Sequence, residues 1–165
     1  FEMDIDEISK MENIEGIVVR FDNGHMVKIK TDWYVLRHKS KDAIMREKNV
    51  LDYILNEKVD DVIPYLTEAD ASKLKEFQSK VNHWLINYSN LAKMTYDLNW
   101  HGDRKEFALK LMNSPNLKDM KGILFKIADG HEPLEVVKNY VASNIGTLNG
   151  IESIRHMIGM EKWIY

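Results

Sequence analysis

The sequence predicts an α+β fold in which a short β-hairpin precedes an all-helical region. Two segments, 14–20 and 25–30, are short and rich in β-branched residues, and their apolar and polar positions alternate. After Lys30 the spacing of apolar residues changes from two to about 3.6 and does not change back. This change of period divides the chain into a sheet-forming part and a helix-forming part.

The turn between the two strands is predicted at Asp22, Asn23 and Gly24, because these residue types tolerate a positive φ. A two-stranded hairpin is only marginally stable alone in water, so we expect it to belong to a larger sheet or to lie against the helices. The chain opens on Phe1 rather than methionine. We therefore expect a piece of a longer protein, with an incomplete sheet.

Apolar spacing and capping residues predict where the helices lie. An apolar stripe that includes Ile44 predicts a helix over 42–56, and Thr67 is the predicted N-cap of one long helix over 68–99. The tryptophans at 84, 100 and 163 are expected to pack between helices. Further helices are predicted over 103–113, over 117–128, from Pro133 to about 144, and after a cap at Asn149.

Composition excludes several classes of protein. The chain has no cysteine, which excludes a disulfide framework, a thiolate zinc site and a cysteine nucleophile. Its six histidines lack the spacing of a zinc site. No apolar run approaches the roughly 18 residues of a membrane span. We expect a soluble, cytoplasmic protein that does not bind membranes.

Basic residues are unevenly distributed along the chain. The net charge of −3 argues against a protein that coats nucleic acid through bulk charge. Residues 20–48 nevertheless hold eight Lys/Arg against four Asp/Glu, and residues 73–126 hold ten against five. These stretches are either nucleic-acid-binding surfaces or ordinary helical surfaces of mixed charge.

The residues that could carry chemistry are concentrated in the hairpin. Lys28 and Lys30 are two apart on one predicted strand, so their side chains project from the same face. Two neighbouring ammonium groups repel each other unless an anion lies between them, and phosphate is a natural candidate. Glu15, at the start of the paired strand, could hold the divalent metal that such chemistry uses. The alternative is a solvent-facing hairpin with ordinary charged residues.

A resemblance favours the first interpretation. The segments EGIVVR (15–20) and KIKTDWYV (28–35) resemble motifs IV and V of the covalent nucleotidyltransferases, which include DNA ligases, RNA ligases and mRNA capping enzymes. Together with NIEG (13–16), they closely resemble the bacteriophage T-even type of ATP-dependent RNA ligase that repairs broken tRNA. GDRKEFA (102–108) is similar to a segment of that family's helical C-terminal domain.

The resemblance implies that Glu15 belongs to the metal and nucleotide site. It also implies that Lys28 and Lys30 contact the α-phosphate of ATP or of the lysyl adenylate. ATP and Mg²⁺ would be cofactors of the intact enzyme, and RNA, above all tRNA anticodon-loop ends, would be its substrate. Residues 1–36 would end a nucleotidyltransferase domain, and residues 37–165 would form a helical RNA-specificity domain.

The chain lacks the K-x-D-G motif that carries the adenylated lysine in this family. The missing N-terminal nucleotidyltransferase region of the same protein is therefore an expected partner. We expect the intact parent protein to be the enzyme, and this chain alone to be inactive. The rival interpretation is a non-catalytic helical RNA-binding or interaction module. DNA ligases and capping enzymes are less favoured, since they usually continue into a β-barrel rather than helices.

Two further groups of residues are candidate RNA contacts. His101, Arg104 and Lys105 lie at a predicted helix start, where free amide groups and basic side chains can converge on a phosphate. The alternative there is a solvated turn. Trp33 and Tyr34 could stack on a base, although aromatic residues just after a strand more often pack in a core.

Overall fold

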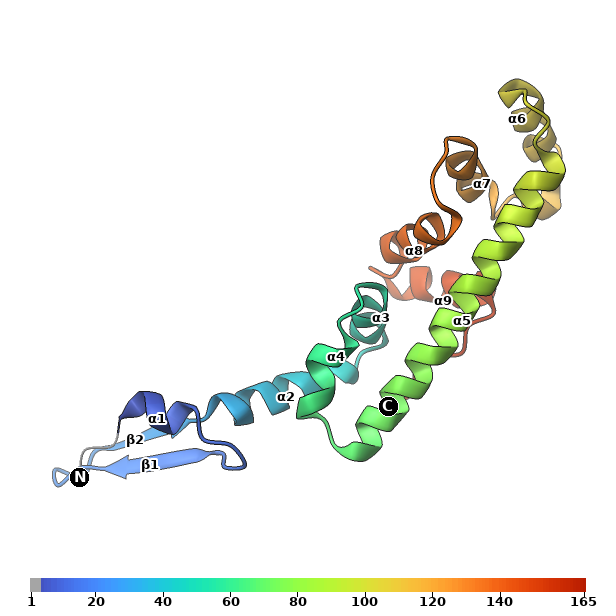
Figure 1. The fold of residues 1–165 in the computed structure, drawn as a ribbon. Helices are drawn as coiled ribbons and strands as arrows, with labels where there is room; N and C mark the ends of the chain where they lie inside the picture. Colours follow the sequence, from blue (N-terminus) through green and yellow to red (C-terminus); the bar gives the residue numbers. More distant parts are fainter. Residues whose placement is uncertain (1–3) are drawn as a thin grey trace.

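A two-stranded hairpin and a helical body occupy opposite ends of an elongated molecule (Figure 1). This computed structural model describes residues 4–165, and Phe1, which motivated the expectation of a longer protein, lies outside the described residues. The hairpin consists of β1 (Gly16–Arg20) and β2 (Met26–Lys30), with the short helix α1 (Ile5–Ser9) packed against it. The predicted α+β class is confirmed.

The hairpin pairs in a single antiparallel register, with Gly16 opposite Lys30. Its turn begins at Phe21, whose amide donates a hydrogen bond to the carbonyl of His25 at 2.8 Å. Gly24 within the turn adopts a φ of 83°, which residues with a side chain rarely adopt. The turn therefore lies where it was predicted. Over residues 4–165 the sheet has these two strands only.

Two helices replace the single helix predicted over 42–56. The first, α2 (Asp32–Ile44), follows β2 directly, and the second, α3 (Glu47–Leu55), begins after a break at Met45. The prediction was wrong because the apolar stripe on which it relied extends across this break. Much of α2 is exposed and polar, so most of that helix lacks the buried face that reveals a helix in a sequence.

Thr31 starts α2 immediately after the sheet. Its hydroxyl oxygen accepts a hydrogen bond from the amide of Tyr34 at 3.2 Å, as an N-cap residue does. The hairpin and the helical body are therefore joined by a continuous helix, and the predicted domain boundary at residue 36 falls inside it.

The long helix predicted over 68–99 is confirmed as α5 (Glu68–Asn99), with Thr67 as its N-cap. The last helix is capped by Thr147, whose hydroxyl accepts from the amide of Gly150 at 3.0 Å, so the prediction of Asn149 as the cap was wrong. The remaining elements are α4 (Val59–Val62), the 3-10 turns η1 (Ile63–Tyr65) and η2 (Pro115–Leu117), α6 (Arg104–Met112), α7 (Lys121–Ala128), α8 (Pro133–Asn144) and α9 (Leu148–Ile158).

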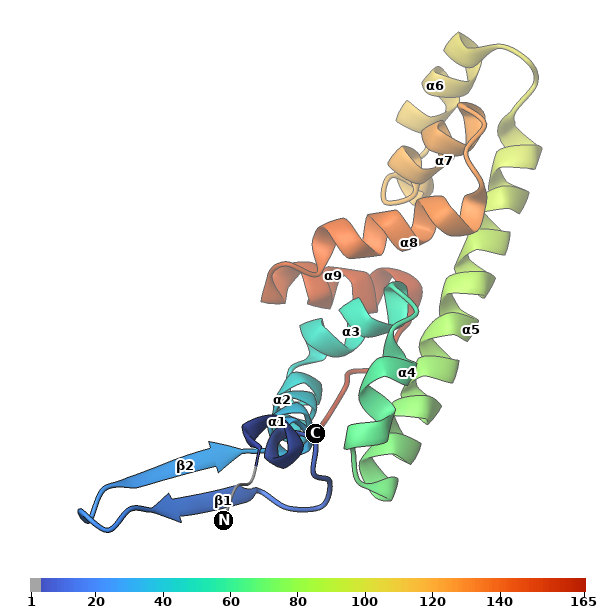
Figure 2. The same ribbon diagram turned by 60° about the vertical axis from the view of Figure 1, so that its left-hand side comes forward.

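The main core lies along one side of α5, where α3, α7, α8 and α9 pack (Figure 2). The apolar side chains that recur every three or four residues along α5 are buried at Leu74, Phe77, Val81 and Leu85, but further along the helix Leu91 is exposed. Burial of these side chains supplies the main driving force for folding the helical body. No helix that the structure describes is both long and apolar enough to cross a lipid bilayer.

The segment after α9 returns to the core and is held there by Trp163. Its indole Nε1 donates a hydrogen bond to the carbonyl of Ile44 at 2.7 Å, and its ring lies 5.0 Å from that of Phe77. Trp163 is 5% exposed, so the prediction that it packs between helices is confirmed. This contact connects the end of α2 to α5.

Candidate phosphate-binding site

The two lysines of β2 lie on the same face of the hairpin, as their spacing predicted. Gly16 lies opposite Lys30 and Val18 opposite Lys28, so these four positions share one face of the hairpin. Lys28 and Lys30 are both exposed. An apolar hollow lies between the hairpin and α1; its lining residues are Ile5, Ile8, Ile17, Val18, Val19, Phe21, Val27 and Ile29.

Glu15, just before β1, forms a hydrogen-bonded ion pair with Lys28. The hydrogen bond from Lys28 holds the pKa of the Glu15 carboxyl below its ordinary value; burial opposes this shift, and the charges of Lys28 and Lys30 lower the pKa further. The same hydrogen bond raises the pKa of Lys28. Both side chains remain about half exposed, at 45% and 50%, so the pair stays accessible to an anion from solution.

Gly16 allows the two strands to approach each other closely beside this pair. A Cβ atom added at Gly16 would lie 2.0 Å from the carbonyl oxygen of Ile29, well inside van der Waals contact. The backbone of Glu15 is therefore held beside β2, where its side chain reaches Lys28. This close approach gives a physical reason for a glycine directly after the glutamate.

Thr31 fixes the other side of the site. Its hydroxyl donates to the carbonyl of Ile14 at 2.7 Å, and its amide donates to the carbonyl of Glu15 at 3.0 Å. The Thr31 side chain is fully buried at this junction. The residues before β1 are thus tied to the start of α2, which places the first turn of that helix next to Glu15.

An open hollow of about 350 Å³ lies between Glu15 and α2. The guanidinium of Arg37 lies 5.1 Å from the ring centroid of Trp33, and the rings of Tyr34 and His38 meet edge to face at 4.3 Å. We call this the α2 hollow; its lining residues are Glu15, Trp33, Tyr34, Arg37, His38 and Lys41.

Trp33 and Tyr34 are half-buried and line this hollow rather than the main core. The expectation that they pack in a core was therefore wrong. Sequence reasoning also missed Arg37, His38 and Lys41. The signal that could have found them is the cap at Thr31, because it begins a helix on which side chains four residues apart share a face.

The charged side chains of the site are two lysines and one glutamate. Among residues 4–165, no three His, Cys, Asp or Glu side chains are grouped so that they could hold a metal. Mg²⁺ in proteins often takes one or two carboxylates and completes its shell with phosphate oxygens and water. The site holds one carboxylate, that of Glu15, beside Lys28 and Lys30.

The second predicted contact, at the start of α6, has a different geometry. The carboxylate of Asp103 accepts hydrogen bonds from the amides of Lys105 at 2.8 Å and Glu106 at 3.3 Å. Arg104 forms an ion pair with Asp129. The expectation of free amide groups at this helix start was therefore wrong, because the helix is already capped by its own aspartate.

The structure does not bring the two predicted groups together. His101 and Lys105 are exposed near α6, at the opposite end of the molecule from the hairpin that carries Lys28 (Figure 1). One bound phosphate cannot contact both. A single RNA would have to extend along the helical body to reach both places.

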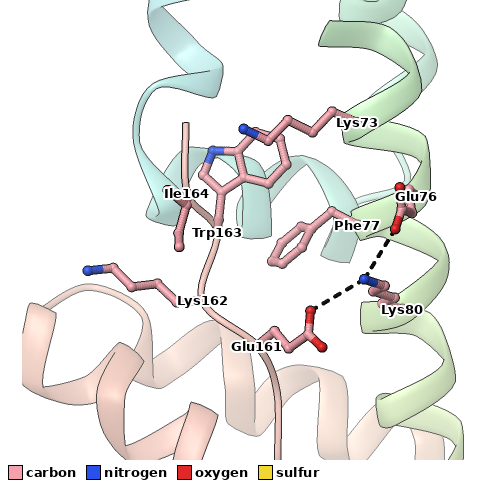
Figure 3. A pocket seen from close by; sticks show the side chains of 8 residues that line it. All are labelled: Lys73, Glu76, Phe77, Lys80, Glu161, Lys162, Trp163 and Ile164. Carbon is pink, nitrogen blue, oxygen red and sulfur yellow. Dashed lines mark hydrogen bonds and ion pairs between the residues drawn. The ribbon is translucent and has the colours of Figure 1, made fainter. Parts of the chain in front are cut away.

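A third basic surface lies between α5 and the segment after α9, and it includes Lys73 and Lys80 of the basic stretch 73–126 (Figure 3). Lys80 is bound there by Glu76 at 3.2 Å and by Glu161 at 3.4 Å. Lys73 lies 5.0 Å from the ring centroid of Trp163. Two carboxylates, those of Glu76 and Glu161, neutralise Lys80, so we interpret the surface as structural.

No protein-family model matches the chain, and no solved structure matches it. The interpretation of the site therefore depends on its own geometry and on the motifs of the hairpin.

Proposed function

We propose that this chain is the C-terminal portion of an ATP-dependent RNA ligase that joins RNA 5′-phosphate and 3′-hydroxyl ends, as in the repair of tRNA anticodon loops. The observation that carries the proposal is the arrangement of Lys28 and Lys30 on one exposed face, with Lys28 held against Glu15. The resemblance of residues 13–16 and 28–35 to the ligase motifs supports the same conclusion.

In this proposal Lys28 and Lys30 bind the phosphate that is transferred. Phosphoryl and nucleotidyl transfer place additional negative charge on phosphate oxygens in the transition state, and fixed cations stabilise that charge without reorganising. Glu15 orients Lys28, and the hydrogen bond between them raises the pKa of the Lys28 ammonium. A bound Mg²⁺ would neutralise further phosphate charge beside Glu15.

The reaction of the proposed family proceeds in three steps. A lysine attacks the α-phosphorus of ATP and releases pyrophosphate, AMP passes from that lysine to an RNA 5′-phosphate, and a 3′-hydroxyl then displaces AMP. The attacking lysine would lie in the missing region of the parent protein, since this sequence has no K-x-D-G motif. This chain would supply phosphate contacts and RNA selection.

The rival function is a helical RNA-binding or interaction module without catalysis. The α2 hollow favours this alternative in one respect, because it combines aromatic and basic side chains and needs no further domain to be complete. The two proposals differ in what they require of Glu15, Lys28 and Lys30. A binding module needs no adenylated intermediate, whereas the ligase fails without these residues.

The test compares this chain with the parent protein that extends it upstream. We expect α-labelled ATP to label the parent covalently and to leave the present chain unlabelled; labelling of this chain would overturn the proposal. In the parent, Lys28→Ala and Lys30→Ala should each reduce sealing by at least about 100-fold. Lys39→Ala, an exposed lysine outside the site, is the matched control and should seal normally.

A further inference from the structure

The α2 hollow has features of a site for one strand of nucleic acid, and we infer that it binds single-stranded RNA next to the Lys28 and Lys30 face. In this inference Arg37 and Lys41 hold neighbouring backbone phosphates, and Trp33 supports a stacked base. That the strand is RNA rests on the proposed ligase function. That the hollow binds a negatively charged single strand is inferred from the geometry of the hollow alone.

The lining side chains are spaced to follow a strand. Trp33, Arg37 and Lys41 are each four residues apart on α2, so they form one stripe along the helix. Each step along this stripe advances about 6 Å along the helix axis. Long, flexible side chains at such intervals can meet neighbouring phosphates of an extended strand.

Glu15, the acidic residue that also lines the hollow, is paired with Lys28 rather than with this stripe. Among the described residues, neither Arg37 nor Lys41 forms an ion pair, whereas Lys28, Lys80 and Arg104 all do. Unpaired cations that line a hollow favour an anionic occupant, and a phosphate backbone supplies the complementary charge.

Arg37 is held in position before any ligand binds. Its guanidinium lies over the ring of Trp33 at 5.1 Å, a contact that restricts the side chain while its N–H groups can still donate. Arginine binds phosphate through two parallel hydrogen bonds, so a guanidinium that is already oriented loses less entropy when it binds. An aromatic ring beside a cation is also the usual combination for binding a single strand.

The size of the hollow favours a single strand over a duplex. At about 350 Å³ it is near the lower end of ligand-binding sites and suits a single nucleotide. A base can stack on an aromatic side chain only when it is unpaired. The hollow also adjoins Glu15, so the bound strand would lead directly to the phosphate-binding face.

These residues also have structural roles that a test must separate from binding. Lys41 lies in the last turn of α2, where a positive charge favours the helix dipole. Lys39 is exposed on the same helix but does not line the hollow, so Lys39→Ala removes an equal charge without touching the site. Each variant should keep the thermal midpoint of the wild-type chain within a few degrees.

The experiment measures fluorescence anisotropy of a short labelled oligoribonucleotide titrated with this chain, at several salt concentrations. We expect Arg37→Ala/Lys41→Ala to weaken binding by about tenfold or more, and to lower the slope of log K against log salt by about 1.4, the value for two phosphate contacts on a single strand. Lys39→Ala should leave affinity at the hollow largely unchanged. Duplex RNA of the same sequence should compete poorly.

A second pair of oligonucleotides separates this inference from the proposed function. The effect of Arg37→Ala/Lys41→Ala should be the same for 5′-phosphorylated and 5′-hydroxyl strands, whereas Lys28→Ala/Lys30→Ala should weaken only the phosphorylated one. If only the first result is found, the inference stands and the phosphate role of the hairpin lysines fails. The inference is overturned if the wild-type chain does not bind, if the Arg37/Lys41 variant matches Lys39→Ala, or if duplex binds equally well.

Discussion

The hydroxyl of Thr31 donates a 2.7 Å hydrogen bond to the carbonyl of Ile14, seventeen residues earlier in the chain. The same oxygen accepts from the amide of Tyr34, so one fully buried side chain joins the segment before β1 to the first turn of α2. The distance between the ion pair of Glu15 and the α2 hollow depends on this junction.

Replacing Thr31 with valine should weaken both the fold and the site. The change keeps the shape of the side chain but leaves the Ile14 carbonyl and the Tyr34 amide without their partner. Loss of a helix cap together with a buried unsatisfied group costs about 2 kcal/mol. Urea unfolding measures this change. Thr31→Ser keeps the hydroxyl and should recover most of the stability; equal stability of the valine variant and the wild type would contradict the assigned role.

Gly16→Ala should disrupt the hairpin at the point where Glu15 meets β2. The added Cβ would lie 2.0 Å from the Ile29 carbonyl oxygen, so the strands must separate locally. We expect faster amide hydrogen exchange at the Gly16 and Lys30 pair and loss of the Glu15 contact with Lys28. Gly122→Ala is the matched control, because nothing lies within 4 Å of its added Cβ. Unchanged exchange in Gly16→Ala would contradict this account.

The hairpin could be predicted from the sequence because strand alternation and turn residues act locally. The shared face of Lys28 and Lys30 followed from their spacing alone. The ion pair between Glu15 and Lys28 did not, since it depends on the register that places Gly16 opposite Lys30. Register is set by both strands together, and spacing within one strand does not reveal it.

The helix α2 and its hollow could not be predicted from apolar periodicity. Ser40 and Ile44 are the buried residues of α2, so the helix shows no long apolar stripe. The helix starts at a cap formed by Thr31. Nothing in the sequence around this threonine shows that it, rather than another threonine, caps a helix. The capped start of α6 was misjudged for a similar reason, because Asp103 occupies amides that a phosphate would need.

The carboxyl of Glu15 should titrate below the ordinary range for glutamate, because Lys28 donates a hydrogen bond to its charged form. A depressed folded-state pKa adds stability above the ordinary pKa, and that stability is lost as the pH falls through the folded value. Carbon-detected NMR of the Glu15 carboxyl measures the shift. Lys28→Ala should raise this pKa towards its ordinary value, and Lys39→Ala should leave it unchanged. A Glu15 pKa that does not respond to Lys28→Ala would contradict the ion pair.

Trp163→Ala should destabilise the helical body strongly, although the residue lies only two positions from the end of the sequence. The indole packs on Phe77 and donates a 2.7 Å hydrogen bond to the Ile44 carbonyl (Figure 3 shows the ring beside α5). Loss of a buried tryptophan typically costs about 3–5 kcal/mol. Trp163→Phe keeps an aromatic ring but removes the hydrogen bond, so it should cost about 1–3 kcal/mol.

The neighbouring Ile164 provides the control for this prediction, because its side chain is 70% exposed and Ile164→Ala should change the free energy of unfolding very little. Chemical unfolding of the three variants measures their free energies of unfolding and so gives the order of their stabilities. We expect Trp163→Ala to be the least stable, Trp163→Phe intermediate and Ile164→Ala close to the wild type. If Trp163→Ala proves as stable as Ile164→Ala, the segment after α9 does not hold α2 and α5 together.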